Sequence, residues 1–292
     1  MVLKWFYNNC EIIVLMGGIL LKLISICPSN TELIAYLGLT GSLIGVDNFS
    51  DWPKGINRLP RLGPDLEIDM DKVEDLKPDL VLASLSVPGM EQNIKELEKR
   101  NIPYVIVPNP QTLQEVGDCL LFVGKVTKTY DKAKQLYEKF TRILTYYDSL
   151  SHQVGTKKTL YWEWWAKPIF TPGAGNWLTE VSRLAGGQNV FEDQEEASVQ
   201  TSWEDVKLRN PDVICVVWVG VHKNKVNPKV ILKRPGWDQM NAAQHNQLYI
   251  LDEPLFCRPS PRLLNGLAQI AHLLHPEIYP IYNNGNDILI NS

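Results

Sequence analysis

Tryptophans at the carboxyl ends of predicted β-strands are the residues of this sequence best suited to bind a ligand. The chain of 292 residues contains nine tryptophans, and five of them occupy such positions: Trp52, Trp162, Trp164, Trp165 and Trp218. Ligands of open parallel α/β sheets bind outside the carboxyl ends of the strands, and a tryptophan is seldom fully buried. The pattern predicts an aromatic-lined cleft for a large flat or amphipathic ligand. The alternative is that the same rings pack against helices.

Other candidate ligand contacts occupy equivalent positions. Ser29 and Asn30 follow the first predicted strand, and Phe256 and Arg258 follow the last one. Their hydroxyl, amide and guanidinium groups could meet polar groups at the edge of a ligand.

Two glutamates begin predicted helices. Glu91 starts the segment 90–101, and Glu204 lies in the first turn after Ser202. The helix dipole stabilises an acidic residue there by about 0.3–1 kcal/mol, which explains both positions without any function.

Sequence signatures of enzymes and metal sites are missing. There is no G-x-G-x-x-G, Walker A or G-x-S-x-G motif. His272 and His275 are three residues apart on the last predicted helix, but no third ligand lies nearby in the sequence. We therefore predict no catalytic residue, no metal site and no cofactor.

Composition excludes further classes of protein. The chain is 45% hydrophobic and 21% charged, with a net charge of −4, so it lacks the basic balance of a nucleic-acid binder. Its five cysteines form no C-x-x-C pair and are predicted to be structural.

Alternating strands and helices must position these residues. In the first part, strands are predicted at 22–27, 43–46, 79–84 and 103–107, and a helix at 29–38 opens with a capping box of Ser29 and Glu32. Later strands are predicted at 159–165, 212–219 and 247–252, and a last helix begins at Pro261. Such alternation predicts an α/β fold with parallel sheets.

One sequence pattern occurs twice and indicates two similar lobes. "VEDLKPDLVLA" at 73–83 and "WEDVKLRNPDVICV" at 203–216 both read as a helix, a Pro-Asp pair and a buried strand. Between them, one long amphipathic helix is predicted at 128–153. We expect an amino-terminal α/β lobe at 22–127, this connecting helix, and a second α/β lobe with a tail at 154–292.

The amino terminus is predicted to be an extension, residues 1–21, outside the core. Its apolar run, residues 12–21, is similar to the core of a signal peptide, but no small-x-small cleavage site follows.

Several segments in this order resemble one family. "LISICPSNTELIAYLGL", "IGVDNFSDWP", "LKPDLVLA", "NPDVI" and "SPR" are similar to the substrate-binding proteins of ABC importers for cobalamin and iron–siderophores. The cobalamin-binding branch is the most similar, and the resemblance covers residues 22–275.

The resemblance implies a fold, a partner and a location. It implies two parallel-sheet lobes bridged by one long helix, with the ligand between the lobes. It also implies a monomer outside the cytoplasm, whose Glu91 and Glu204 dock into arginine pockets of an ABC permease dimer. No convincing signal peptide or lipobox is present, so a cytoplasmic location is the alternative.

The ligand implied is cobalamin or a related corrinoid, which the aromatic residues would cover while Arg258 and Asn30 meet amide or phosphate groups. Leu85 and Leu255 stand where cobalamin binders often have tryptophan. Two alternatives stay open. One is a ferric siderophore or haem binder, and the other is an α/β enzyme acting on a tetrapyrrole-like substrate.

Overall fold

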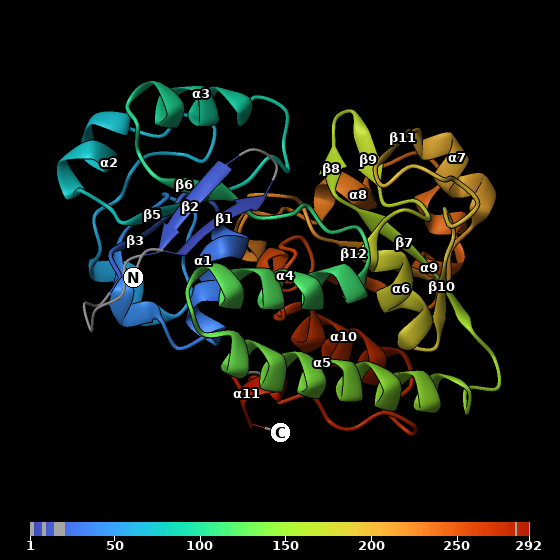
Figure 1. The fold of residues 1–292 in the computed structure, drawn as a ribbon. Helices are drawn as coiled ribbons and strands as arrows, with labels where there is room; N and C mark the ends of the chain where they lie inside the picture. Colours follow the sequence, from blue (N-terminus) through green and yellow to red (C-terminus); the bar gives the residue numbers. More distant parts are fainter. Residues whose placement is uncertain (1–2, 8–9, 15–20, 284, 292) are drawn as a thin grey trace. The chain divides into compact units, whose positions relative to one another are not determined.

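The chain folds into two compact units, each built around a parallel β-sheet (Figure 1). The structure is a computed structural model that describes residues 3–7, 10–14, 21–283 and 285–291. The first unit comprises Met1–Asn109 and Cys119–Gln135, and the second Pro110–Asp118 and Leu136–Ser292. The predicted α/β fold is confirmed.

The sheet of the first unit has the strand order β4-β3-β5-β6, and all neighbouring strands are parallel. Its strands are β3 (Leu23–Ser25), β4 (Leu43–Val46), β5 (Leu80–Ala83) and β6 (Tyr104–Ile106). The helices are α1 (Pro28–Tyr36), α2 (Met70–Leu76) and α3 (Glu91–Lys99), with 3-10 turns at Thr40–Ser42 and Lys54–Arg58. Apolar side chains of α2 and α3 pack on β3 and β5 in one core, which explains why these strands are almost entirely apolar.

The second unit contains a parallel sheet in the order β10-β7-β12-β13 and a smaller antiparallel sheet, β11-β9-β8. The parallel strands are β7 (Lys158–Glu163), β10 (Gly187–Asn189), β12 (Val213–Val216) and β13 (Leu248–Ile250). The antiparallel strands are β8 (Trp165–Ala166), β9 (Ile169–Thr171) and β11 (Val199–Thr201).

The helices of the second unit vary in length. They are α6 (Trp177–Leu184), α7 (Trp203–Arg209), α8 (Lys229–Leu232), α9 (Asn241–Gln244), α10 (Leu263–Leu274) and α11 (Ile288–Asn291). Single 3-10 turns occur at Lys223–Lys225, Trp237–Gln239 and Glu253–Leu255.

The long helix predicted at 128–153 is confirmed as α5 (Tyr130–Ser151). It follows α4 (Leu113–Val126), and each of these two helices contributes residues to both units. Within the described residues, no helix combines the length and apolarity needed to cross a membrane.

The two copies of the repeated sequence pattern adopt the same local structure. In the first, α2 ends with Lys77 in the left-handed conformation (φ 49°), and Pro78 and Asp79 lead into β5. In the second, α7 ends with Asn210 at φ 42°, before another Pro-Asp pair leads into β12.

The aspartate of each copy binds the start of the neighbouring strand. Asp79 Oδ2 accepts a hydrogen bond from Lys22 N at 2.8 Å, directly before β3. Asp212 Oδ2 accepts one from Thr159 N in β7, also at 2.8 Å. Each repeated unit therefore sets the register between its own strand and the adjacent one.

Two predicted helix starts are corrected. Helix α1 begins at Pro28 with Cys27 as N-cap, and no side chain caps it. A proline at the first helical position has a suitable φ and no N–H to satisfy, so the helix starts before Ser29 and the predicted capping box does not form. Helix α10 begins at Leu263, with Arg262 as N-cap, and not at Pro261.

The aromatic run at 159–165 is not one strand. It divides after Glu163, where β7 ends, and Trp165 begins the antiparallel hairpin of β8 and β9.

At the amino terminus, β1 (Leu3–Tyr7) and β2 (Cys10–Val14) form an antiparallel pair separate from both parallel sheets. Most of the predicted apolar run at 12–21 lies outside the described residues.

We expect the two Pro-Asp aspartates to differ in their contribution to stability. Asp212 also accepts hydrogen bonds from Thr159 Oγ1 and Asn241 Nδ2, both at 2.9 Å, and is half-buried. Replacing it by alanine should lower the free energy of unfolding by about 2–3 kcal/mol, whereas Asp79→Ala, at an exposed site, should cost about 0.5–1 kcal/mol. Urea unfolding measures both values, and equal losses would contradict the assigned role of Asp212.

Candidate functional site

Ser29 and Asn30 lie at the carboxyl edge of the first sheet, and both are engaged within their own unit. Asn30 is 1% exposed and its Nδ2 donates to Ala83 O at 2.9 Å, at the end of β5. Ser29 Oγ lies 3.3 Å from Cys27 Sγ. Their contacts fix the start of α1 against the sheet, so we assign them a supporting position.

The loop after β4 holds Trp52 at the same edge. Asp47 is buried, and its Oδ2 accepts hydrogen bonds from Phe49 N at 2.7 Å and Ser50 N at 3.1 Å. Burial raises the pKa of the Asp47 carboxyl. Arg61 Nη1 donates to Ser50 O at 2.5 Å and so closes the loop from the other side.

The Trp52 ring is half-buried, and its centroid lies 5.1 Å from that of Tyr36. One side of the indole is therefore supported by protein, while part of the ring stays accessible.

Trp162 and Phe256 lie in the core of the second unit instead of on a surface. Both have an exposed fraction of 0%, and their ring centroids are 5.4 Å apart. Trp162 Nε1 donates to Ser182 Oγ at 2.8 Å. Trp162 lies inside β7 and points into the core, so the prediction of a ligand-facing ring at these two positions is replaced by a supporting role.

Trp164 and Trp165 follow directly on the carboxyl end of β7. Trp164 is half-buried beside Trp177, with ring centroids 6.0 Å apart, and its Nε1 has no hydrogen-bond partner within the described structure. Trp165 is 44% exposed, and its Nε1 donates to Lys167 O at 3.1 Å. Trp165 thus presents the largest accessible indole surface among the predicted tryptophans.

A buried charge cluster fixes the last predicted tryptophan. Glu163, the final residue of β7, is fully buried, and its Oε1 accepts a hydrogen bond from Trp218 Nε1 at 3.0 Å. The Arg234 guanidinium donates to both carboxylate oxygens, at 2.5 Å and 2.9 Å. Tyr161 OH donates to Oε2 at 2.9 Å. Four donors therefore satisfy this carboxylate, and the half-buried Trp218 ring is held at the strand end.

Arg258 lies in the loop after the last strand but is almost completely buried. Its exposed fraction is 9%, and its Nη2 lies 3.4 Å from Glu253 Oε2. In this structure the guanidinium neutralises a carboxylate of its own unit.

Glu91 and Glu204 lie in the first turns of α3 and α7, as predicted, and both are exposed. Glu91 Oε2 accepts a hydrogen bond from Gly89 N at 2.8 Å. Backbone N–H groups, that of Glu91 itself and that of Gly89, lower the pKa of the Glu91 carboxyl. Glu204 is exposed, and its contact with Lys207 is long, at 3.7 Å. Both carboxylates are accessible to a partner.

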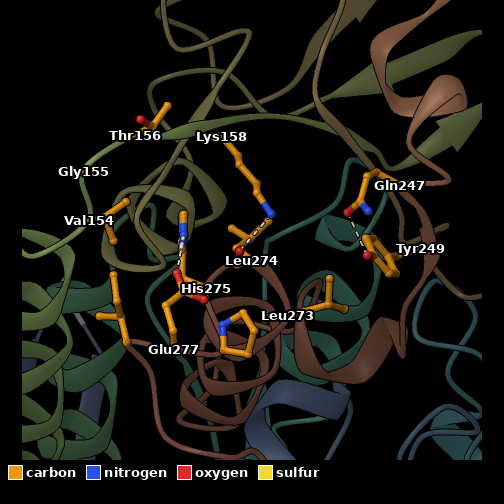
Figure 2. Close-up of a pocket in the computed structure, with 12 residues that line it drawn as sticks. Val154, Gly155, Thr156, Lys158, Gln247, Tyr249, Leu273, Leu274, His275 and Glu277 are labelled. Carbon is orange, nitrogen blue, oxygen red and sulfur yellow. Dashed lines mark hydrogen bonds and ion pairs between the residues drawn. The ribbon is translucent and has the colours of Figure 1, made fainter.

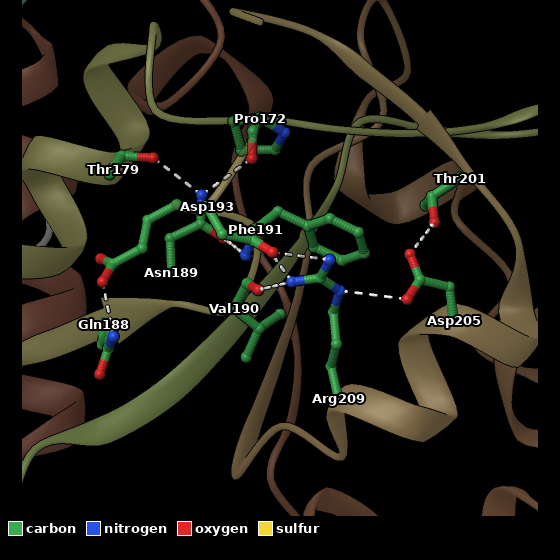
Figure 3. A network of polar contacts seen from close by, with 11 residues as sticks. Pro172, Thr179, Gln188, Asn189, Val190, Phe191, Asp193, Thr201, Asp205 and Arg209 are labelled. Atoms are coloured by element: carbon green, nitrogen blue, oxygen red, sulfur yellow. Dashed lines mark hydrogen bonds and ion pairs between the residues drawn. The ribbon is translucent and has the colours of Figure 1, made fainter. Parts of the chain in front are cut away.

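Arg209, at the end of α7, anchors the helix that carries Glu204 (Figure 3). Its guanidinium contacts Asp193 Oδ1 at 2.7 Å and Asp205 Oδ1 at 3.2 Å, and donates to Val190 O. It also lies over the Phe191 ring, 4.1 Å from the centroid. Because one side chain joins α7 to the segment after β10, the helix is held rigidly against its unit.

A pocket of about 520 Å³ lies at the opposite, amino end of the second sheet. Lys158 begins β7, and Gln247 and Tyr249 flank the start of β13 (Figure 2). Lys158 Nζ donates to Leu274 O at 2.9 Å, and His275 Nε2 lies 3.1 Å from Gly186 O. The polar groups of this pocket are already engaged, so it does not compete with the carboxyl edge as the candidate site.

The cysteines whose side chains are described are free, and most of them are buried. Cys27, Cys119, Cys215 and Cys257 are free thiols, and burial raises the pKa of Cys27, Cys215 and Cys257. Among the described residues, no three His, Cys, Asp or Glu side chains gather closely enough to hold a metal ion. Cys10 lies outside the residues whose side chains are described.

Sequence reasoning missed Glu163, Arg234 and Arg61. A single glutamate inside the apolar run "LYWEWW" was a usable signal, because a charge in a buried strand requires a partner. The partner itself could not be found in the sequence, since Arg234 is 71 residues away.

The periplasmic binding protein family model matches residues 23–255. The chain belongs to this family.

Relatives match over nearly the whole chain. An ABC transporter substrate-binding lipoprotein of Bacillus subtilis is 30% identical over 262 residues, 88% of this chain and 81% of that protein. A vitamin B12-binding protein of Vibrio cholerae is 26% identical over 256 residues, 87% of this chain and 88% of that protein. The crystal structure of a possible iron-binding, periplasmic solute-binding protein of Staphylococcus epidermidis has a TM-score of 0.73 at 26% identity, and covers 86% of this chain and 98% of its own.

We expect the buried charge cluster to dominate the stability of the second unit. Arg234→Ala leaves the Glu163 carboxylate buried without its countercharge, which should lower the free energy of unfolding by about 3–5 kcal/mol. The control is Arg183→Ala, which breaks a surface pair with Asp148 whose side chains are 54% and 40% exposed. That change should cost less than about 1 kcal/mol. Chemical denaturation measures both, and a loss below about 1 kcal/mol for Arg234→Ala would contradict the role given to the cluster.

Proposed function

We propose that this protein binds cobalamin or a related corrinoid and delivers it to an ABC importer. The observation that carries the proposal is the similarity to a vitamin B12-binding protein of Vibrio cholerae, which extends over 87% of this chain and includes both units. The protein acts as a carrier, and it catalyses no reaction.

The accessible aromatic residues support a large flat ligand. Trp52 near the edge of the first sheet and Trp218 at the edge of the second are half-buried, and Trp165 is exposed. A ring contact or a hydrogen bond fixes each of these indoles. Fixed rings lose little conformational entropy when they cover a macrocycle.

The partner in this proposal is an ABC permease dimer, and the protein meets it on the extracytoplasmic side of the membrane. Membership of the family supports this partner. Glu91 and Glu204 each contact an arginine of the permease. Both carboxylates are exposed, and Arg209 anchors the helix of the second one. Charge-assisted pairs of this kind orient the partners and speed their encounter.

A ferric siderophore is the second candidate ligand. The Staphylococcus epidermidis neighbour, described as a possible iron-binding protein, supports it at 26% identity. Leu85 is also 39% exposed after β5 and offers an aliphatic surface in place of a ring.

The exposed tryptophans should determine corrinoid affinity. We expect Trp165→Ala and Trp218→Ala each to weaken cyanocobalamin binding about tenfold, because each removes ring contact worth about 1.4 kcal/mol. Tyr146→Ala is the matched control, since this exposed ring of α5 takes no part in the proposal.

The quantity to measure is the dissociation constant from intrinsic fluorescence, with ferrichrome and haemin titrated in parallel. Saturable binding of ferrichrome or haemin without binding of cyanocobalamin would overturn the corrinoid proposal. Unchanged affinity in both tryptophan variants would remove these rings from the site.

Docking should be separable from ligand binding. The double substitution Glu91→Ala and Glu204→Ala should slow corrinoid import by at least about tenfold in vesicles containing the cognate permease, because two charge-assisted contacts are lost. Its cyanocobalamin affinity should equal that of the wild type. The control is Glu138→Ala with Glu195→Ala, two exposed glutamates of the second unit. Import at the wild-type rate in the Glu91 and Glu204 variant would contradict the docking roles.

A further inference from the structure

A second pocket of the second unit, about 620 Å³ in volume, lies beside Glu204. We call it the lysine pocket. It is formed by the start of α7, the turn between β8 and β9, and the segment around α8, and its polar side chains include Lys167, Glu204, Asn227, Lys229, Lys233 and Arg234.

The pocket carries an excess of positive charge. Within the described residues, Lys167, Lys229 and Lys233 have no carboxylate within the 4.0 Å of an ion pair. The other charges are already paired, Glu204 with Lys207 and Arg234 with Glu163. Three amines thus lack countercharges in a chain whose net charge is −4.

This arrangement costs stability in the isolated protein. Lys229 begins α8 and Lys233 is its C-cap, four positions later, and like charges at this spacing destabilise a helix by about 0.2–0.5 kcal/mol. An anionic occupant would relieve the repulsion.

The wall of the pocket is rigid. The Trp203 ring stacks on Trp237, with centroids 6.5 Å apart, and its Nε1 donates to Pro235 O at 2.9 Å. The Arg234 guanidinium lies 4.8 Å from the centroid of Trp203. A rigid wall favours binding because its side chains lose little conformational entropy when a partner binds.

The exposed face of α7 adds an apolar contact beside the pocket. Leu208 is 85% exposed and lies four residues after Glu204, so both side chains project from the same face of the helix. Acidic, apolar and cationic groups therefore adjoin one another on the surface of this unit.

We propose that the lysine pocket receives acidic side chains of the same protein partner on which Glu204 docks. This inference rests on the proposed docking function and specifies its chemistry: the partner presents a basic residue to Glu204, an apolar one to Leu208 and carboxylates to the lysines. A protein fits better than a free anion, because only a protein surface can present a basic residue to Glu204 and an apolar one to the exposed Leu208 together with the carboxylates. The mixture of acidic and basic groups also favours one docking orientation, because in a wrong orientation like charges of the two proteins would face each other.

The test uses the full chain and a hexaglutamate peptide as the probe, followed by two-dimensional NMR. We expect saturable one-site binding, with shifts of the amide signals of residues 167–169 and 229–234. Lys229→Glu with Lys233→Glu should weaken this binding about tenfold, because two ion pairs become repulsive. Replacing the same two lysines by glutamine should give a smaller loss. Lys134→Glu with Lys157→Glu, which changes the net charge equally at exposed sites elsewhere, should leave binding unchanged.

Three results would overturn the proposal. The first is that the peptide does not bind saturably, or that the Lys134→Glu, Lys157→Glu control loses as much affinity for the peptide as the Lys229→Glu, Lys233→Glu protein. The second is complete displacement of the peptide by equimolar inorganic phosphate, which would show a site for small anions. The third is that the protein binds vesicles of phosphatidylglycerol and that the double substitution Lys229→Glu with Lys233→Glu abolishes this binding. That result would show a lipid-binding surface.

The inference and the proposed function fail in different ways. The Lys229→Glu, Lys233→Glu protein should keep wild-type cyanocobalamin affinity, because neither lysine belongs to the proposed ligand surface. If the peptide does not bind while the Glu91 and Glu204 variant still loses import, only the lysine pocket is refuted.

Discussion

The second unit depends on one buried ion pair, Glu163 with Arg234. A carboxylate at the end of a central strand carries a large desolvation cost, which the countercharge and two further hydrogen bonds offset. Trp218 is fixed by the same carboxylate, and the Arg234 guanidinium also lies over Trp203 at the start of α7. The proposed ligand surface and the proposed docking helix are therefore supported by one group of contacts.

The same structural motif occurs in both units, and it leaves the carboxyl edge of each sheet free for loops that carry aromatic residues. A helix, a left-handed residue, a Pro-Asp pair and a strand recur as α2 with β5 and as α7 with β12. In both, the aspartate binds the amino end of the neighbouring strand. Register is thus set at the amino edge of each sheet, which leaves the carboxyl edge available for loops such as that of Trp52 and the β8–β9 hairpin.

The sequence was sufficient for the fold but only partly for the site. Periodicity and the repeated sequence pattern predicted the parallel α/β units and α5, and the resemblance of several segments indicated the family. Burial was harder to predict, because strand position alone does not tell which face of a sheet a tryptophan occupies. Trp162 therefore proved to be core, while Trp165 is exposed. The lysine pocket escaped notice because its residues come from separate segments, and only folding brings them together.

The central proposal is that the protein binds a corrinoid through aromatic residues at the carboxyl ends of its strands. Hydrogen–deuterium exchange of the full chain with and without cyanocobalamin tests it directly. The account predicts slower exchange on binding at residues 49–53, 164–166 and 217–219, with no change at 273–278 beside the amino-end pocket. Slower exchange confined to 273–278, or no change anywhere at saturating cyanocobalamin, would contradict it.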